Sequence, residues 1–148
     1  MKVKKVTSLY MESTKKDPEE TLAEIQKVLR KYSLKKFLAD YDKGEIIGCI
    51  FSIDIDGQEI AFKLPIRWQP LWSLARQGKT KYIRDERQAQ RVAWRIQLRW
   101  MEAQLAIIDI GQAEFQEVFM PYILLKGGST VFQKYSDHGF KALRESNE

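Results

Sequence analysis

Apolar residues recur along the chain with two different periods, and each change of period marks a new element. From Pro18 to Tyr32 they are spaced three or four positions apart, as in a helix that lays one face on a core. Asp17 and Pro18 suit the start of such a helix, and Glu20 stands where a capping box would place it. We therefore expect a capped helix over this stretch.

Residues 1–66 otherwise have the two-residue period of strands. The loosely alternating stretch VKKVTSLYM predicts a first strand within residues 1–16. Residues 35–66 are rich in β-branched and aromatic side chains and are interrupted by YDKGE and by Asp56-Gly57, a strong hairpin signal. These turns predict three antiparallel strands, the last of which ends near Pro65.

From Trp68 onward the period is mainly helical. The pattern predicts a short helix that ends at Gly78, a long helix at about 85–110 and another short helix that ends at Pro121. A small hairpin is expected at Gly127-Gly128, followed by a frayed helical tail over residues 136–148. The chain is thus expected to be a single α+β domain, residues 1–148. It should have an antiparallel sheet of three to five strands, with helices packed mainly on one face.

The long helix is apolar on two sides. On a helical wheel, where successive residues turn by about 100°, the group formed by Ala89, Val92, Ala93, Ile96, Trp100, Ala103 and Ile107 is interpreted as the core face. A second apolar group includes Trp94, Leu98, Met101 and Leu105. A helix that is apolar on two sides is either covered within its own domain or shared with a partner. The second group is therefore a candidate for self-association, and the alternative is coverage by residues 114–125 of the same chain.

Positive charge is concentrated around this helix. The formal net charge is +5, but residues 67–104 alone carry nine basic and three acidic side chains. The same stretch holds all four tryptophans and seven of the nine arginines. Within it, Arg87, Arg91, Arg95 and Arg99 recur every four positions and form one stripe on the wheel, which we call the arginine ladder. Few acidic neighbours accompany the ladder, and like charges at this spacing repel.

Three kinds of partner could satisfy the ladder: an external anionic macromolecule, carboxylates from elsewhere in the fold, or a small polyanion. The leading hypothesis is a non-enzymatic protein that binds nucleic acid through these arginines, because guanidinium groups pair well with phosphate. The candidate surface comprises Lys79, Lys81, Arg84, Arg87, Arg91, Arg95 and Arg99. The alternative is a protein–protein module that captures an acidic surface and inhibits or modulates the protein that carries it.

The sequence offers little for catalysis. It has one histidine, His138, in a polar segment, and one cysteine, Cys49, in an apolar run where a buried, inert thiol is expected. No motif predicts a metal site or a cofactor. The pairs Asp40/Asp42 and Asp54/Asp56 leave a magnesium-dependent nuclease as a third hypothesis, although aspartates are common beside turns. No apolar run is long enough to predict a membrane span.

Three stretches resemble a family of small proteins encoded by bacteriophages and prophages: YMESTKKDPEETLAEIQKVL, FKLPIRW and KYIRDERQAQRVAWRIQLRWMEAQLA. The resemblance covers most of the chain, but the family has no established activity or site residues to transfer. It implies a soluble accessory protein that is made in the cytoplasm of an infected bacterium. The lone cysteine agrees with a reducing compartment.

Overall fold

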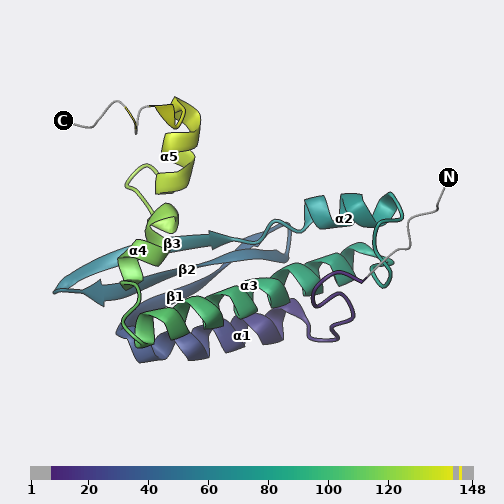
Figure 1. Cartoon of the computed structure of the whole chain (residues 1–148), viewed down its shortest axis with the longest axis horizontal. Coiled ribbons are helices and arrows are strands. Elements are labelled where there is room, and N and C mark those ends of the chain that lie inside the picture. Colours follow the sequence, from purple (N-terminus) through teal and green to yellow (C-terminus); the bar gives the residue numbers. More distant parts are fainter. Residues whose placement is uncertain (1–7, 142–143, 145–148) are drawn as a thin grey trace.

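The computed structural model describes residues 8–141 and 144, which form an α+β fold. In chain order, the elements are α1 (Pro18–Leu29), a 3-10 turn η1 (Arg30–Tyr32), β1 (Leu34–Asp42), β2 (Glu45–Ile55), β3 (Gln58–Pro65), α2 (Gln69–Arg76), α3 (Glu86–Asp109), α4 (Phe115–Phe119), η2 (Met120–Tyr122) and α5 (Val131–His138). The three strands form an antiparallel sheet in the order β1-β2-β3. The predicted fold class and the long helix are therefore confirmed (Figure 1).

Both hairpin turns have the backbone that their sequences predict. Lys43-Gly44 and Asp56-Gly57 each place two successive residues at positive φ, between 52° and 83°. This is the conformation of a two-residue type I′ turn, which favours glycine at the second position. The resulting register places Phe37, Phe51 and Phe62 in one cross-strand row. The next row, formed by Leu38, Ile50 and Lys63, faces the opposite side of the sheet, where Leu38 is 60% exposed.

Helices α1 and α3 lie side by side on one face of the sheet (Figure 1). Their directions are parallel, since Asp17 near the start of α1 meets Arg91, and Tyr32 beyond its end meets Asp109 at the end of α3. The core between these helices and the sheet is closed at one end by α4, through stacked Phe115 and Phe119 rings 4.5 Å apart. These three helices thus cover the apolar side of the sheet.

A second, smaller hydrophobic cluster joins α2 to the first half of α3. Its buried members are Ile83, Ala89 and Val92, and partly buried side chains from Trp68 to Ala75 pack against them. Because Ile83 follows α2, the loop between α2 and α3 folds back onto the same cluster. The loop and α2 therefore form one lobe at the N-terminal end of α3 (Figure 1).

The structure reverses the two apolar faces that the helical wheel assigned to α3. Trp94, Leu98, Met101 and Leu105 are all buried, with at most 3% exposure, and they form the side of α3 that meets the main core. The candidate self-association surface is thus covered by the protein itself. From the predicted core face, Ala89 and Val92 are buried but Ile96 is 37% exposed. The wheel separates the two faces only in part, since Ala93 and Trp100 of the predicted core face also pack against the main core. It carries no information about which face the sheet covers.

The two ends of the chain also differ from expectation. Of the expected first strand within residues 1–16, residues 1–7 lie outside the described part, and residues 8–16 form no strand but contain a turn at residues 10–13. The Gly127-Gly128 hairpin is present in a minimal form, with a single bridge between Leu124 and Thr130. Thr130 then caps α5, a helix that begins before the expected tail and ends at His138. Residues 142–143 and 145–148 of that tail lie outside the described part.

Candidate nucleic-acid interface

The arginine ladder points into carboxylates of the same chain. Arg87 donates to Glu19 at 2.9 Å, and Arg91 donates from Nε to Asp17 at 2.7 Å. Arg99 pairs with Glu102 one turn along α3, at 2.6 Å. The first two bonds join α3 to the start of α1, so the acidic side chains that the ladder lacks locally are supplied by a helix far away in the sequence. Of the three partners considered for the ladder, internal pairing is the one observed.

Arg95 is the most deeply buried member of the ladder. Its side chain is only 7% exposed, and its Nη1 donates to Glu24 at 3.0 Å and to the buried Thr21 hydroxyl at 3.3 Å. A charge in this position needs such partners, because an unpaired buried guanidinium would lose its hydration without compensation. Arg95 is therefore part of the joint between α1 and α3 and is not displayed to solvent.

The ladder also explains why the expected capping box on α1 is absent. Asp17 occupies the N-cap position, but its side chain makes no capping hydrogen bond. Its carboxylate instead accepts from Arg91, and this hydrogen bond is the main reason that its pKa lies below the ordinary value. Glu20, the other expected member of the box, forms an ion pair with Lys16 at 3.6 Å. The Asp17 side chain thus forms a long-range ion pair with Arg91 in place of the local capping hydrogen bond that is usual at this position.

The predicted cations that precede α3 have a different environment. Lys79, Lys81 and Arg84 are all exposed, and none forms an ion pair with a described residue. Sequence reasoning missed Arg67 and Arg76, which share these properties and lie at the two ends of α2. Residues 67–84, which we call the basic α2 segment, contain these five cations and no acidic residue. The absence of acids is visible in the sequence and could have identified the segment.

A buried carboxylate holds the loop that carries three of these cations. Glu12, only 2% exposed, accepts hydrogen bonds from the backbone N–H groups of Lys81 and Tyr82 and, at 2.6 Å, from that of Leu9. The Gln88 side chain fastens the same N-terminal turn to α3 by donating to the backbone carbonyl of Glu12 at 2.9 Å. The exposed side chains of the loop therefore project from a fixed backbone.

The aromatic side chains of the basic α2 segment differ in exposure. Trp68 and Trp72 are partly buried in the second cluster, whereas Tyr82 is 43% exposed and its ring lies 5.3 Å from the Lys81 ammonium group. Tryptophans of α3 contribute nothing to this surface, since Trp94 is buried and Trp100 packs edge-on against Phe119. Stacking of a base on this segment would thus depend on Tyr82 rather than on the tryptophans of residues 67–104.

The residues considered for catalysis are not brought together. The two aspartate pairs lie towards opposite ends of the sheet, since Asp40 pairs with Gly48 and Asp54 lies six positions further along β2, a span of roughly 20 Å. In the described part of the chain, no group of three or more histidine, cysteine or acidic residues could hold a metal ion. Burial raises the pKa of the Cys49 thiol to about 12, as expected of an inert core cysteine. His138 is exposed at the end of α5.

Over residues 8–141 and 144, the structure contains no helix with the length and apolar character that crossing a membrane requires. Comparison of the chain with protein-family models, with curated proteins and with solved structures gave no match.

Proposed function

We propose that the protein is a non-enzymatic nucleic-acid-binding protein and that its main contact surface is the basic α2 segment. One observation carries this proposal: Arg67, Arg76, Lys79, Lys81 and Arg84 are exposed, lack carboxylate partners among the described residues and share one lobe. Cations that the fold does not neutralise are the ones available to displace counterions from phosphates. This moves the surface away from the arginine ladder, whose charges are paired with carboxylates at α1 or, for Arg99, within α3.

The resemblance to phage-encoded proteins supplies a context for this proposal. An accessory protein made during infection would meet phage or host nucleic acid in the bacterial cytoplasm. Binding through a handful of phosphate contacts would be independent of sequence, because phosphate contacts carry no sequence information directly. We therefore propose a general rather than a sequence-specific nucleic-acid binder.

The test compares two triple variants, each of which replaces two lysines and one arginine but at a different place on the surface. Lys79→Gln/Lys81→Gln/Arg84→Gln alters the basic α2 segment, and Lys27→Gln/Arg30→Gln/Lys31→Gln removes two lysines and one arginine, all exposed, from the end of α1 and η1. Both variants lower the formal charge by three. Binding to labelled single- and double-stranded DNA is measured by fluorescence anisotropy over a salt series.

The first variant should weaken binding at least tenfold and lower the magnitude of the slope of log affinity against log salt by up to about 2.7, since each of three lost phosphate contacts removes roughly 0.7 to 0.9 from that slope. The control variant should bind within about threefold of the unaltered protein. An equal loss in both variants would show that only net charge matters and would reject the proposed surface.

A second candidate function is a protein–protein module that acts on a bacterial host factor. It is favoured by a groove of about 370 Å³ between α2 and α3, lined by apolar side chains that include Leu71, Leu74 and Ile96, with Arg67 at its edge. Leu74 and Ile96 are each 37% exposed. An acidic amphipathic segment of a partner would suit an apolar groove beside a cation. Leu74→Ser should abolish capture of such a partner from nuclease-treated lysate and leave DNA binding unchanged.

A further inference from the structure

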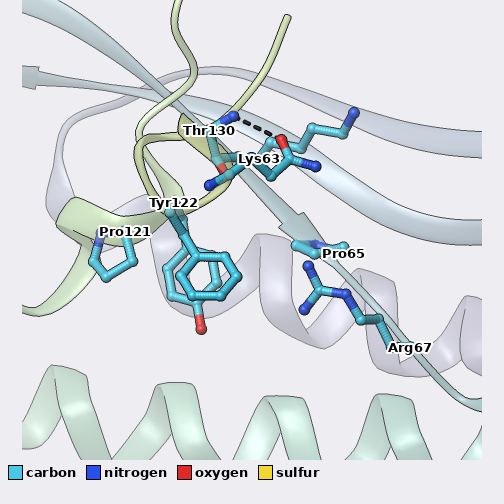
Figure 2. Close-up of a pocket in the computed structure, with 8 residues that line it drawn as sticks. Lys63, Pro65, Arg67, Pro121, Tyr122 and Thr130 are labelled. Carbon is cyan, nitrogen blue, oxygen red and sulfur yellow. Dashed lines mark hydrogen bonds between the residues drawn. The ribbon is translucent and has the colours of Figure 1, made fainter. Parts of the chain in front are cut away.

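A separate pocket of about 290 Å³ lies between β3 and the segment that joins α4 to α5. Figure 2 shows Lys63 and Pro65 on β3 at one side, Pro121 and Tyr122 at the other, and the Arg67 side chain extending from beyond the end of β3. The two walls are held together by the backbone, because Leu124 N–H donates to the Ala61 carbonyl at 2.8 Å. The volume is at the small end of the range for ligand pockets, so the pocket suits one small group.

Two aromatic rings line the pocket. Tyr122 lines the pocket and is supported from behind by Trp100, with the ring centroids 5.8 Å apart. Phe132 lines it from the first turn of α5 and remains 44% exposed. The start of α5 is fixed by a reciprocal capping box, in which Thr130 N–H donates to the Gln133 side chain at 2.8 Å (Figure 2). An exposed ring on an anchored helix end is able to stack on a planar ligand.

The charge of the pocket has one sign. Among the residues that the structure describes, Lys63 and Arg67 are the only charged ones that line the pocket, and no aspartate or glutamate lines it. Neither cation forms an ion pair with any residue in the described part of the chain. Two unneutralised cations beside aromatic rings fit a ligand that has both a planar ring and a negative group. A nucleotide has this combination, since its base stacks and its phosphate pairs with cations.

We propose that this pocket binds one nucleotide unit of single-stranded nucleic acid, with the base against Tyr122 and Phe132 and the phosphate at Lys63 and Arg67. The inference rests on the proposed function and deepens it, because Arg67 belongs both to the pocket and to the basic α2 segment. Double-stranded nucleic acid can use the basic segment but not the pocket, since its bases are stacked on their neighbours. The pocket therefore gives the protein a preference for single strands.

The test measures single- and double-stranded DNA affinities in parallel for Phe132→Ala and Lys63→Gln. Tyr10→Ala and Lys134→Gln are matched controls, because both residues are exposed and neither lines the pocket. Phe132→Ala should weaken single-strand binding about tenfold, a typical loss for one stacked base, and leave duplex binding within twofold. Lys63→Gln should also lower the single-strand salt slope by about 0.7. Equal losses on both forms of DNA, or no loss on either, would overturn the inference.

Failure of the proposed function can be told apart from failure of the pocket. If the unaltered protein binds neither form of DNA, the proposed function is wrong. Titration with a free 5′-mononucleotide then tests whether the pocket binds a nucleotide. Saturable shifts of the Tyr122 and Phe132 ring protons in the NMR spectrum, with the Tyr122 shifts reduced in Phe132→Ala, would support the pocket as a nucleotide site. Unchanged spectra at millimolar nucleotide would overturn it as well.

Discussion

At the scale of single residues, Glu12 shows how one buried charge can organise a surface. Its carboxylate accepts three backbone N–H groups from two segments that are far apart in the sequence. Glu12→Gln leaves one oxygen to accept and turns an NH₂ group towards donors, so at least one buried N–H loses its partner. We expect a loss of roughly 2 kcal/mol in the free energy of unfolding, measured by urea denaturation.

Glu20→Gln is the control for this prediction, because Glu20 is exposed and pairs only with exposed Lys16. An exposed ion pair of this kind contributes well under about 1 kcal/mol. Similar stability of the two variants would contradict the anchoring role that we assign to Glu12.

Tyr32 gives a pH prediction at the same scale. Burial, together with the hydrogen bond that its hydroxyl donates to Asp109 at 2.8 Å, raises its pKa to about 12 from an ordinary value of 10. The folded state thus favours the neutral phenol. This contribution to stability is fully present below pH 10 and is lost as the pH rises through 12. Tyr32→Phe should therefore lose less stability than the unaltered protein between pH 9 and pH 11.5.

The comparison is made by urea denaturation of both proteins at the two pH values, which cancels the titration of the lysines that both share. At pH 9 the variant should be less stable by about 1 kcal/mol, the usual effect of one lost hydrogen bond. Parallel pH dependence of the two proteins would show that the Tyr32 phenol does not couple to folding.

At the scale of elements, the contact between α1 and α3 contains an ion pair whose two partners differ in burial. The Arg95 side chain is 7% exposed, whereas that of its partner Glu24 is 38% exposed. Glu24→Ala leaves a buried guanidinium with only the Thr21 hydroxyl, so we expect a loss of roughly 2–3 kcal/mol. Arg95→Met removes the buried charge, keeps an unbranched apolar side chain and leaves a carboxylate that water can reach, so we expect a loss below about 1.5 kcal/mol.

Thermal and urea unfolding of the two variants tests this order. Glu19→Ala serves as the control, since its partner Arg87 is 41% exposed and can be hydrated when the pair is broken. A larger loss for Arg95→Met than for Glu24→Ala would mean that apolar packing of the Arg95 stem, rather than burial of its charge, dominates the joint.

The elements themselves could largely be predicted, because they depend on local pattern. Period and turn residues identify α1, the three strands, α2 and α3, and the Asp56-Gly57 hairpin follows from backbone preference. The helical wheel likewise isolates the arginine ladder as one face of α3. It cannot reveal that Asp17, Glu19 and Glu24 lie across from that face, because this depends on which helix packs alongside. The same limit hides the pocket, whose walls at Lys63 and Phe132 meet only in the folded chain.

At the scale of the whole molecule, two hydrophobic clusters of unequal size share α3. Within residues 8–141 and 144, the main cluster contains fifteen buried residues and the second has three, and α2 itself contributes no fully buried side chain. Segments with little buried apolar surface open at a lower free energy than the global unfolding transition. We therefore expect the amides of α2 to exchange hydrogen for deuterium faster than those of β2 or of the middle of α3.

Glu12 connects this prediction to the proposed surface. Its carboxylate fastens the loop after α2, so Glu12→Gln should speed exchange across residues 70–85 more than it speeds exchange in β2. Mass spectrometry of peptides from the labelled protein resolves the two regions. If the α2 lobe is part of the binding surface, saturating DNA should slow its exchange, and the loosened variant should bind more weakly because more of the loop must be ordered on binding. Exchange of α2 at the rate of β2 in the unaltered protein would mean that the two clusters unfold as one unit, and the basic segment would then be a rigid surface.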